Sequence, residues 1–140
     1  MSDDFEYETE LQVRFADIDA MGHVNNATYA TYLEQARVDY YADVLGVGLD
    51  DIDTVLVNLQ IDYRHEITLD DETVTVAMGV TSIGESSVTV DYEVRAGDHV
   101  AATAETTQVY VDPDEGASRP LPETWVEKME AQRADDDDSQ

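Results

Sequence analysis

One helical stripe, set among segments of alternating polarity, most restricts what this chain can fold into. Apolar residues recur at spacings of three and four along one segment, at Tyr29, Leu33, Ala36, Tyr40 and Val44. That spacing places them on one face of an α-helix. Asn25 or Asn26 supplies its N-cap, and Gly46 stops it after Leu45. We therefore expect a helix of about 19 residues, or five turns.

Strand-like segments flank this helix on both sides. Apolar and polar residues alternate in the segments 55–63, 73–83 and 86–96 and, more loosely, in 6–15, and the segment 99–111 is predicted as a last strand. Tight turns at Gly84 and Gly97 connect the last three segments into an antiparallel meander. A sheet with one apolar face and an amphipathic helix bury both surfaces when the sheet curls around the helix. The order predicts an α+β hotdog fold, in which a five-stranded antiparallel sheet wraps a long central α-helix.

The domain organisation follows from length and from the acidic end of the chain. We expect a single domain over residues 1–134 and an acidic disordered tail over residues 135–140, with a short surface helix at residues 122–133. A single helix is too small to cover the whole face of a five-stranded sheet, and an open sheet leaves its edge strands exposed. We therefore expect a homodimer or a homotetramer.

The net charge is extreme. Asp and Glu number 33 against 7 Lys and Arg, which gives a formal net charge of -26. Such a chain repels itself in dilute salt, whereas molar salt shortens the Debye length to about 3 Å. The acidic residues are spread through every segment, which indicates the high-salt cytoplasm of an extreme halophile; the alternative is an ordinary acidic protein with an acidic C-terminus. The phosphate backbone of nucleic acid would be repelled, so we expect no nucleic-acid partner.

Other compositional features exclude several kinds of site and location. The chain contains no cysteine, so it forms no disulfide, thiolate metal site or cysteine nucleophile. It has no run of about 18 apolar residues and no apolar core near its start, so we expect neither a membrane span nor a signal peptide, and a cytoplasmic location. His65 and His99 have no metal-ligand partner nearby in the sequence, and we expect neither a metal nor a cofactor.

The segment 13–37 carries the chemistry. Two carboxylates, Asp17 and Asp19, precede a glycine-containing turn and the polar start of the helix. The first turn of a helix presents unpaired N–H groups, which can polarise a thioester carbonyl as an oxyanion hole does. A carboxylate nearby can attack the carbonyl carbon or deprotonate a water that attacks it. Which of these two routes operates stays open, and neither needs a metal.

This segment resembles the 4-hydroxybenzoyl-CoA thioesterase-like branch of the hotdog superfamily. The pattern is carried by Asp17, Asp19, Gly22, Val24, Asn26, Tyr29, Glu34, Ala36 and Arg37. The sequence 21–26 is similar to that of long-chain or general acyl-CoA members, and the likeness extends over residues 8–112, including Ile61-Asp62-Tyr63-Arg64. The resemblance implies an acyl-CoA thioesterase that holds CoA as part of its substrate.

The resemblance also assigns roles to residues. It places the catalytic carboxylate at Asp19 and the polarising backbone N–H groups near Asn25 and Asn26. His23 is predicted to be an acid, a substrate contact or a hydrogen-bonded loop residue. The expected substrate-binding residues are Gly22, Val24, Asn25, Tyr29 and Arg64, the last as a contact for a CoA phosphate or a subunit.

Competing interpretations stay open. Asp17 is predicted to be structural, with a helper role beside Asp19 as the alternative, and Glu34 is predicted to pair with Arg37 three residues later on the helix or else to act on the substrate. A hotdog hydratase or dehydratase would pair an acidic residue with a histidine such as His23, although the Asp-x-Asn-Pro-x-His type of signature is missing. A non-catalytic module that binds an acyl ligand is the third possibility.

Overall fold

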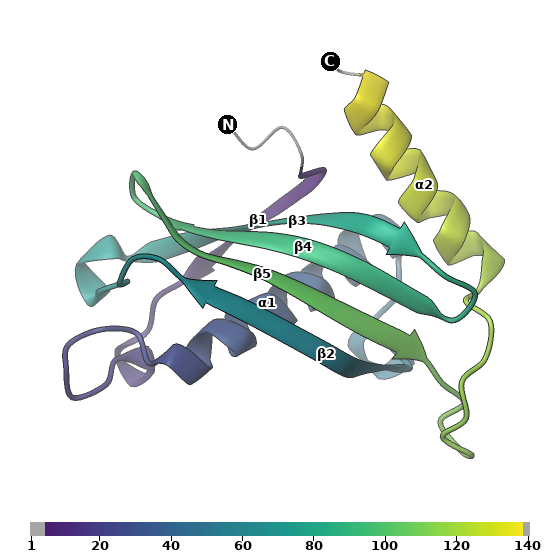
Figure 1. The fold of residues 1–140 in the computed structure, drawn as a ribbon, viewed down its shortest axis with the longest axis horizontal. Helices are drawn as coiled ribbons and strands as arrows, with labels where there is room; N and C mark the ends of the chain where they lie inside the picture. The colour runs from purple at the N-terminus through teal and green to yellow at the C-terminus, as the bar shows by residue number, and fades with distance from the viewer. Residues whose placement is uncertain (1–4, 139–140) are drawn as a thin grey trace.

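A computed structural model of the protein describes residues 5–138, with side chains through Arg133. The main elements are β1 (Tyr7–Gln12), α1 (Asn26–Tyr40), β2 (Thr54–Tyr63), β3 (Thr73–Ile83), β4 (Ser87–Ala96), β5 (His99–Tyr110) and α2 (Glu123–Asp138). Short helical turns are η1 (Phe15–Asp17), η2 (Tyr41–Leu45), η3 (Leu49–Asp51) and η4 (Leu69–Asp71). The five strands form one antiparallel sheet in the order β1-β3-β4-β5-β2 (Figure 1).

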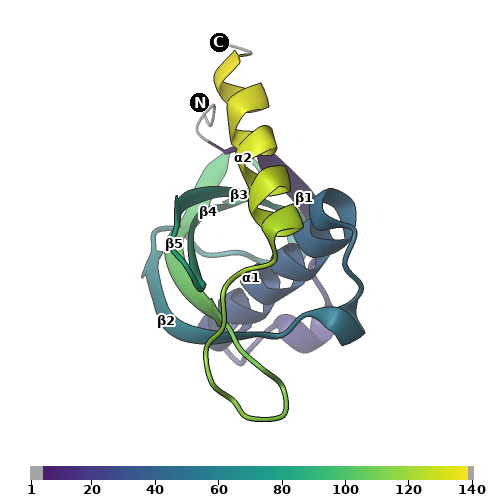
Figure 2. The ribbon, with the colours of Figure 1, turned by 90° about the vertical axis from the view of Figure 1, so that its right-hand side faces the viewer.

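The sheet curves around α1, which lies against its concave face (Figure 2). Leu33 and Ala36 on α1 are 1% and 0% exposed, and they belong to one core cluster with Tyr92 and Val94 of β4. The apolar stripe of the helix and the apolar face of the sheet therefore bury each other, as the sequence pattern predicts. The α+β wrapped-sheet architecture is confirmed.

The central helix continues past α1 into a wider π-helical turn, η2. Gly46 ends it with φ 70°, a left-handed conformation that glycine adopts without steric cost. Lys128 on α2 donates to the Leu45 carbonyl oxygen at 3.2 Å, which satisfies one of the unpaired carbonyls of the helix end. The predicted span from Asn26 to Leu45 is confirmed, with its last turn wider than an α-helix.

The first strand ends earlier than its alternation predicts. The backbone N–H of Arg14 donates to the Asp17 carboxylate at 2.9 Å, and the Asp17 N–H donates to the Arg14 carbonyl at 2.9 Å. This reciprocal cap starts the turn η1, so the predicted strand at residues 6–15 ends at Gln12 and Phe15 does not belong to it. Its side chain is 82% exposed.

β2 was expected to be half-buried, and it is largely exposed instead. It is an edge strand, and a bulge between Leu56 and Asn58 interrupts its alternation. Val57 is 57% exposed and Leu59 is 39% exposed. The alternation identified the strand but not its position at the edge.

α2 extends beyond the predicted surface helix. Its backbone is helical from Glu123 to Asp138, whereas the sequence predicts a helix at residues 122–133 and an acidic disordered tail from residue 135. Trp125 and Met129 anchor α2 in the core, and extending an already formed helix costs little per residue. Residues 139–140 of that tail, and the side chains from residue 134 on, lie outside the described part. No helix within residues 5–138 is long and apolar enough to cross a membrane.

Candidate active site

Asp19 sits in a tight turn that its own side chain helps to close. Its Oδ1 accepts a hydrogen bond from the Met21 N–H at 2.9 Å, and its carbonyl accepts from the Gly22 N–H at 3.0 Å. Gly22 has φ 83°, a backbone conformation that glycine adopts without steric cost and that other residues disfavour. The Asp19 side chain is half-buried, and within residues 5–138 no hydrogen bond reaches its second oxygen, Oδ2. One carboxylate oxygen therefore orients the group and the other is open.

Asn25, and not Asn26, is the N-cap of α1. The Asn25 side chain accepts from the Ala27 N–H and its carbonyl accepts from the Thr28 N–H, both at 2.9 Å. Among the described residues, the Asn26 N–H has no hydrogen-bond partner. The first amide of the helix is thus left open at the positive end of its dipole.

The cap can be tested by its contribution to stability. Asn25→Ala removes the acceptor for the Ala27 N–H, and we expect the free energy of unfolding to fall by about 1 kcal/mol, while Asn25→Asp keeps the acceptor and most of the stability. Urea unfolding monitored by circular dichroism measures both variants. Equal loss in the two variants would show that the cap bond contributes nothing.

Asp17 has the bonds of a structural residue. Its carboxylate accepts from the Arg14 N–H and from the Tyr32 hydroxyl, both at 2.9 Å, and its carbonyl accepts from the Asn25 N–H at 2.9 Å. Burial, together with this hydrogen bond from Tyr32, raises the pKa of Tyr32 well above its usual value. Asp17 thereby ties the turn before Asp19 to the side of α1, in agreement with its predicted structural role.

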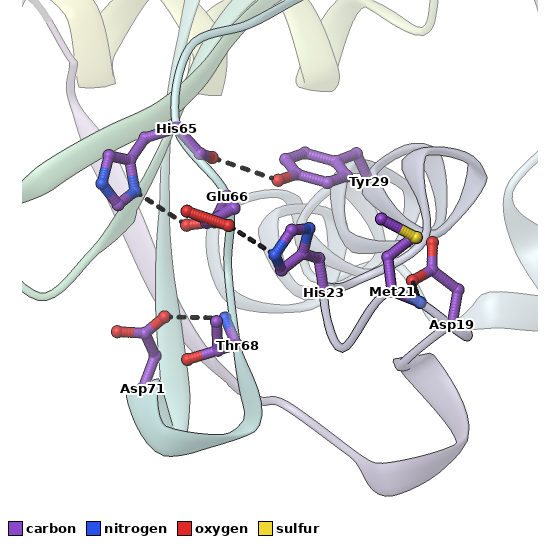
Figure 3. A network of polar contacts seen from close by, with 8 residues as sticks. All are labelled: Asp19, Met21, His23, Tyr29, His65, Glu66, Thr68 and Asp71. Atoms are coloured by element: carbon purple, nitrogen blue, oxygen red, sulfur yellow. Dashed lines mark hydrogen bonds and ion pairs between the residues drawn. The ribbon is translucent and has the colours of Figure 1, made fainter.

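His23 points away from Asp19 and toward Glu66, in the segment that follows β2. The sequence does not predict that this segment lies beside the loop. The His23 Nε2 lies 2.5 Å from the Glu66 carboxylate (Figure 3). Figure 3 shows Asp19 on the other side of His23, beside Met21. The Val24 N–H donates to the Ile67 carbonyl at 2.8 Å, which fixes this loop against the segment after β2. His23 is therefore oriented by Glu66.

Two of the predicted substrate-binding side chains lie in the core. Val24 is 2% exposed and Tyr29 is 3% exposed. The Tyr29 hydroxyl donates to the His65 carbonyl at 3.3 Å, and its ring packs edge-on against Tyr63 at a centroid distance of 5.0 Å. Burial raises the pKa of Tyr29 above its usual value, with Tyr63 adding to the effect. Their burial favours a packing role over the substrate contact predicted for them.

The end of β2 reaches the helix start, which brings Arg64 into the neighbourhood. The Tyr63 hydroxyl donates to the Asn26 carbonyl at 3.0 Å. Arg64 follows in the sequence, is exposed, and donates from Nε to the Thr103 hydroxyl at 3.3 Å. Asp19, Asn26 and His23 thus lie around one end of α1, while Arg64 lies beyond it on the sheet.

The predicted ion pair between Glu34 and Arg37 does not form. Arg37 does not pair with Glu34, because its Nη1 donates to the Tyr92 hydroxyl at 3.3 Å and the side chain turns onto the sheet. Within residues 5–138, no group of three or more His, Cys, Asp or Glu side chains could hold a metal ion.

Comparison with known proteins gives a consistent picture. Residues 13–129 match the family profile described as the thioesterase-like superfamily. A crystal structure of a thioesterase from Thermus thermophilus, complexed with coenzyme A and Zn, superposes with a TM-score of 0.85 and 32% identity, covering 94% of this chain and 96% of that one. A DHNA-CoA thioesterase from Staphylococcus aureus shares the fold with a TM-score of 0.83 at 24% identity, over 95% of this chain and 94% of that one.

Sequence relatives match over shorter stretches. The long-chain acyl-CoA thioesterase FadM of Escherichia coli is 35% identical across 46% of this chain and 51% of its own length. The protein YsmA of Bacillus subtilis is 28% identical across 63% of this chain and 60% of its own length. The matched regions therefore span about half to three fifths of these two relatives.

Proposed function

Because the chain belongs to the thioesterase-like superfamily, we propose that it hydrolyses an acyl-CoA thioester to a free acid and CoA. Support comes from the solved thioesterase that binds coenzyme A and from the acyl-CoA thioesterase relative. The observation that carries the proposal is local. A carboxylate with one open oxygen, Asp19, and an amide with an open hydrogen, Asn26, flank the same end of α1.

The proposed mechanism uses these two groups in turn. The thioester carbonyl oxygen accepts a hydrogen bond from the Asn26 N–H, where the helix dipole stabilises the negative charge that develops as the carbon becomes tetrahedral. Asp19 then attacks this carbon to form an anhydride that water cleaves, or it takes a proton from the attacking water. In both routes the carbon–sulfur bond breaks and CoA leaves as a thiolate that takes up a proton.

The surrounding residues support this chemistry without a cofactor. The turn at Gly22 and the cap at Asn25 hold the two groups in place, and His23, oriented by Glu66, is proposed as the acid for the leaving thiolate or as a substrate contact. The proposed steps require only a carboxylate, a backbone amide, a water molecule and a proton donor. We propose that no metal or cofactor takes part.

A hydrolysis screen tests the proposal. Purified protein is incubated in molar KCl with a panel of aliphatic and aryl acyl-CoA substrates, and released CoA is measured with a thiol reagent. We expect release for at least one acyl class. Hydration of enoyl-CoA without CoA release would favour the hydratase, and tight binding without turnover would favour a non-catalytic module. Hydration by a paired base and acid has less support, because His23 lies toward Glu66 and away from Asp19, the carboxylate with which it would have to pair.

We also propose that the protein is a homodimer or homotetramer joined through β2. This edge strand exposes Leu56 (45%), Val57 (57%) and Leu59 (39%), and its unpaired backbone groups offer a second copy a ladder of hydrogen bonds.

The interface has a simple test. Leu59→Glu places a charge in the expected interface, and we expect the dissociation constant between copies to rise by at least about tenfold, seen as a shift to monomer mass in light scattering. Leu69→Glu, at a residue of similar exposure (44%) but on η4, serves as the matched control and should leave the mass unchanged. An unchanged mass for Leu59→Glu would remove β2 from the interface.

The charge supports a proposal about location. A chain with a net charge of -26 is suited to a cytoplasm of molar salt, and we propose that this is where it works.

A further inference from the structure

Arg37 is a half-buried cation that no carboxylate neutralises. Its Nη1 donates to the Tyr92 hydroxyl at 3.3 Å, and among the described residues the guanidinium makes no ion pair. Arg95 and Arg119, by contrast, each pair with a carboxylate, at 2.7 and 3.1 Å. A charge that is partly removed from water without a counter-ion is costly, so this guanidinium is suited to an anionic ligand.

A pocket of about 240 Å³, the Arg37 pocket, lies between the second half of α1, the turn η3 and the first part of β2. Gln108 lines this pocket and is only 3% exposed. Its amide donates to the Thr106 hydroxyl, which also shares a hydrogen bond of 2.7 Å with the Tyr92 hydroxyl. Both Arg37 and Gln108 carry further N–H groups that can donate to an anion. Glu34 lines the pocket too, but it is exposed, and Arg37 turns onto the sheet without pairing with it.

An apolar track on β2 joins this pocket to the candidate active site. Leu56, Leu59 and Tyr63 each pair with a buried residue of β5, so their side chains face the side of the sheet on which α1 lies (Figure 2). All three are between 39% and 48% exposed. Leu56 lines the Arg37 pocket at one end of the track, and at the other end the Tyr63 hydroxyl donates to the Asn26 carbonyl. A second copy joined at β2 would cover the open side of this track.

The track has the length of an extended acyl chain. At about 1.5 Å per residue, Arg37 lies about 16 Å along the helix axis from Asn26, the amide proposed to hold the thioester carbonyl. An extended chain of roughly 10 to 14 carbons covers this distance. Apolar side chains of the pocket can contact its last methylene groups, among them Val38, Leu49 and Ile52. The end of the chain then meets a guanidinium, which favours a chain that ends in an anionic group.

We propose that the preferred substrates are ω-carboxyacyl thioesters, whose acyl chain ends in a carboxylate, and that Arg37 binds this carboxylate. The chain lies along Leu56 and Leu59, and the Gln108 amide donates to the same carboxylate. Arg37 thereby determines specificity and takes no part in breaking the thioester bond. The thioester end of such a substrate rests on the proposed function, whereas the binding of the far carboxylate can be measured without turnover.

Binding of dodecanedioate tests the Arg37 pocket directly. Calorimetric titration in molar KCl compares it with dodecanoate, which lacks the second carboxylate. We expect dodecanedioate to bind about tenfold more tightly, and Arg37→Met to remove this difference by loss of a charge-assisted contact. Arg133→Met removes a half-buried arginine on α2 that does not line the pocket, so this matched control should keep the difference. Equal binding of the two acids by the unaltered protein, or no binding of either, would overturn the proposal.

Kinetics test the same preference during turnover. We expect kcat/KM for the mono-CoA thioester of dodecanedioic acid to exceed that for dodecanoyl-CoA about tenfold. Arg37→Met should lose this preference through KM, while its hydrolysis of dodecanoyl-CoA stays unchanged and shows that the fold is intact. Arg37→Lys keeps the charge without the planar fork and should retain part of the preference.

The remaining outcomes separate the specificity from the proposed function. An unchanged preference in Arg37→Met, or a stronger preference of the unaltered protein for ω-hydroxydodecanoyl-CoA, would overturn the carboxylate site while leaving hydrolysis intact. If Arg37→Met does not fold, the substrate preference of the unaltered protein and its reduction in Arg37→Lys decide instead. If no thioester is hydrolysed, the proposed function fails, and the titration alone decides whether the carboxylate site exists.

Discussion

Asp19→Asn is expected to reduce thioester hydrolysis by about a thousandfold or more, because an amide is neither a nucleophile nor a base. The substitution is structurally mild. An asparagine side chain can still accept the Met21 N–H that closes the turn, so the loop should keep its shape and the protein its stability. Steady-state release of CoA in molar KCl measures the loss, and thermal unfolding measures the stability.

Two comparisons make the result specific. Asp50→Asn alters an exposed aspartate on η3 and should retain full activity. Asp19→Ala also removes the acceptor of the turn, so it should lose stability as well as activity. Activity retained by Asp19→Asn would exclude Asp19 from the chemistry. Single-turnover hydrolysis in ¹⁸O-labelled water then separates attack by Asp19, which leaves label in its carboxylate, from attack by water.

Diluting the salt is expected to destabilise the folded protein strongly. Between molar and tenth-molar KCl the Debye length grows from about 3 Å to about 10 Å, so the carboxylates of a chain with net charge -26 repel one another across the surface. We expect the midpoint of thermal unfolding to fall by roughly 10 to 20 °C, which corresponds to roughly 3 to 5 kcal/mol for a domain of this size. Circular dichroism melts over a KCl series measure it.

A charge-reduced variant distinguishes repulsion from other effects of salt. Glu115, Glu127 and Glu130 are exposed, and changing all three to Gln lowers the net charge without touching the core. This variant should show a shallower dependence of the melting midpoint on KCl than the unaltered protein. An identical slope for both would mean that the salt acts on something other than the sum of surface charges.

The parts of the fold that could be predicted are those encoded by local patterns. The stripe from Tyr29 to Val44 has the period of a helix, and the segments on either side alternate with the period of a strand, so the elements and their wrapped arrangement followed from the sequence. The loop around Asp19 followed as well, because a carboxylate, a glycine with positive φ and an asparagine cap each act on neighbouring residues.

The parts that could not be predicted depend on contacts between distant residues. Nothing near His23 in the sequence indicates that Glu66 lies 2.5 Å away, or that His99 stacks on His65. The exposure of β2 is a further case, since alternation does not reveal which strand forms the edge. The end of the first strand was predicted too late for the opposite reason, because the local cap between Arg14 and Asp17 overrides the alternation at Phe15.

The bond between Lys128 and the Leu45 carbonyl has a practical consequence for handling the protein. Lys128 is the only lysine, and its ammonium holds α2 against the carboxyl end of the central helix. Amine-directed biotinylation or surface coupling would acylate Lys128 and the amino terminus. Acylation of Lys128 would remove its charge and weaken the hydrogen bond to the Leu45 carbonyl that joins α2 to the central helix. Because the chain has no cysteine, a single engineered thiol on an exposed turn gives a cleaner point of attachment.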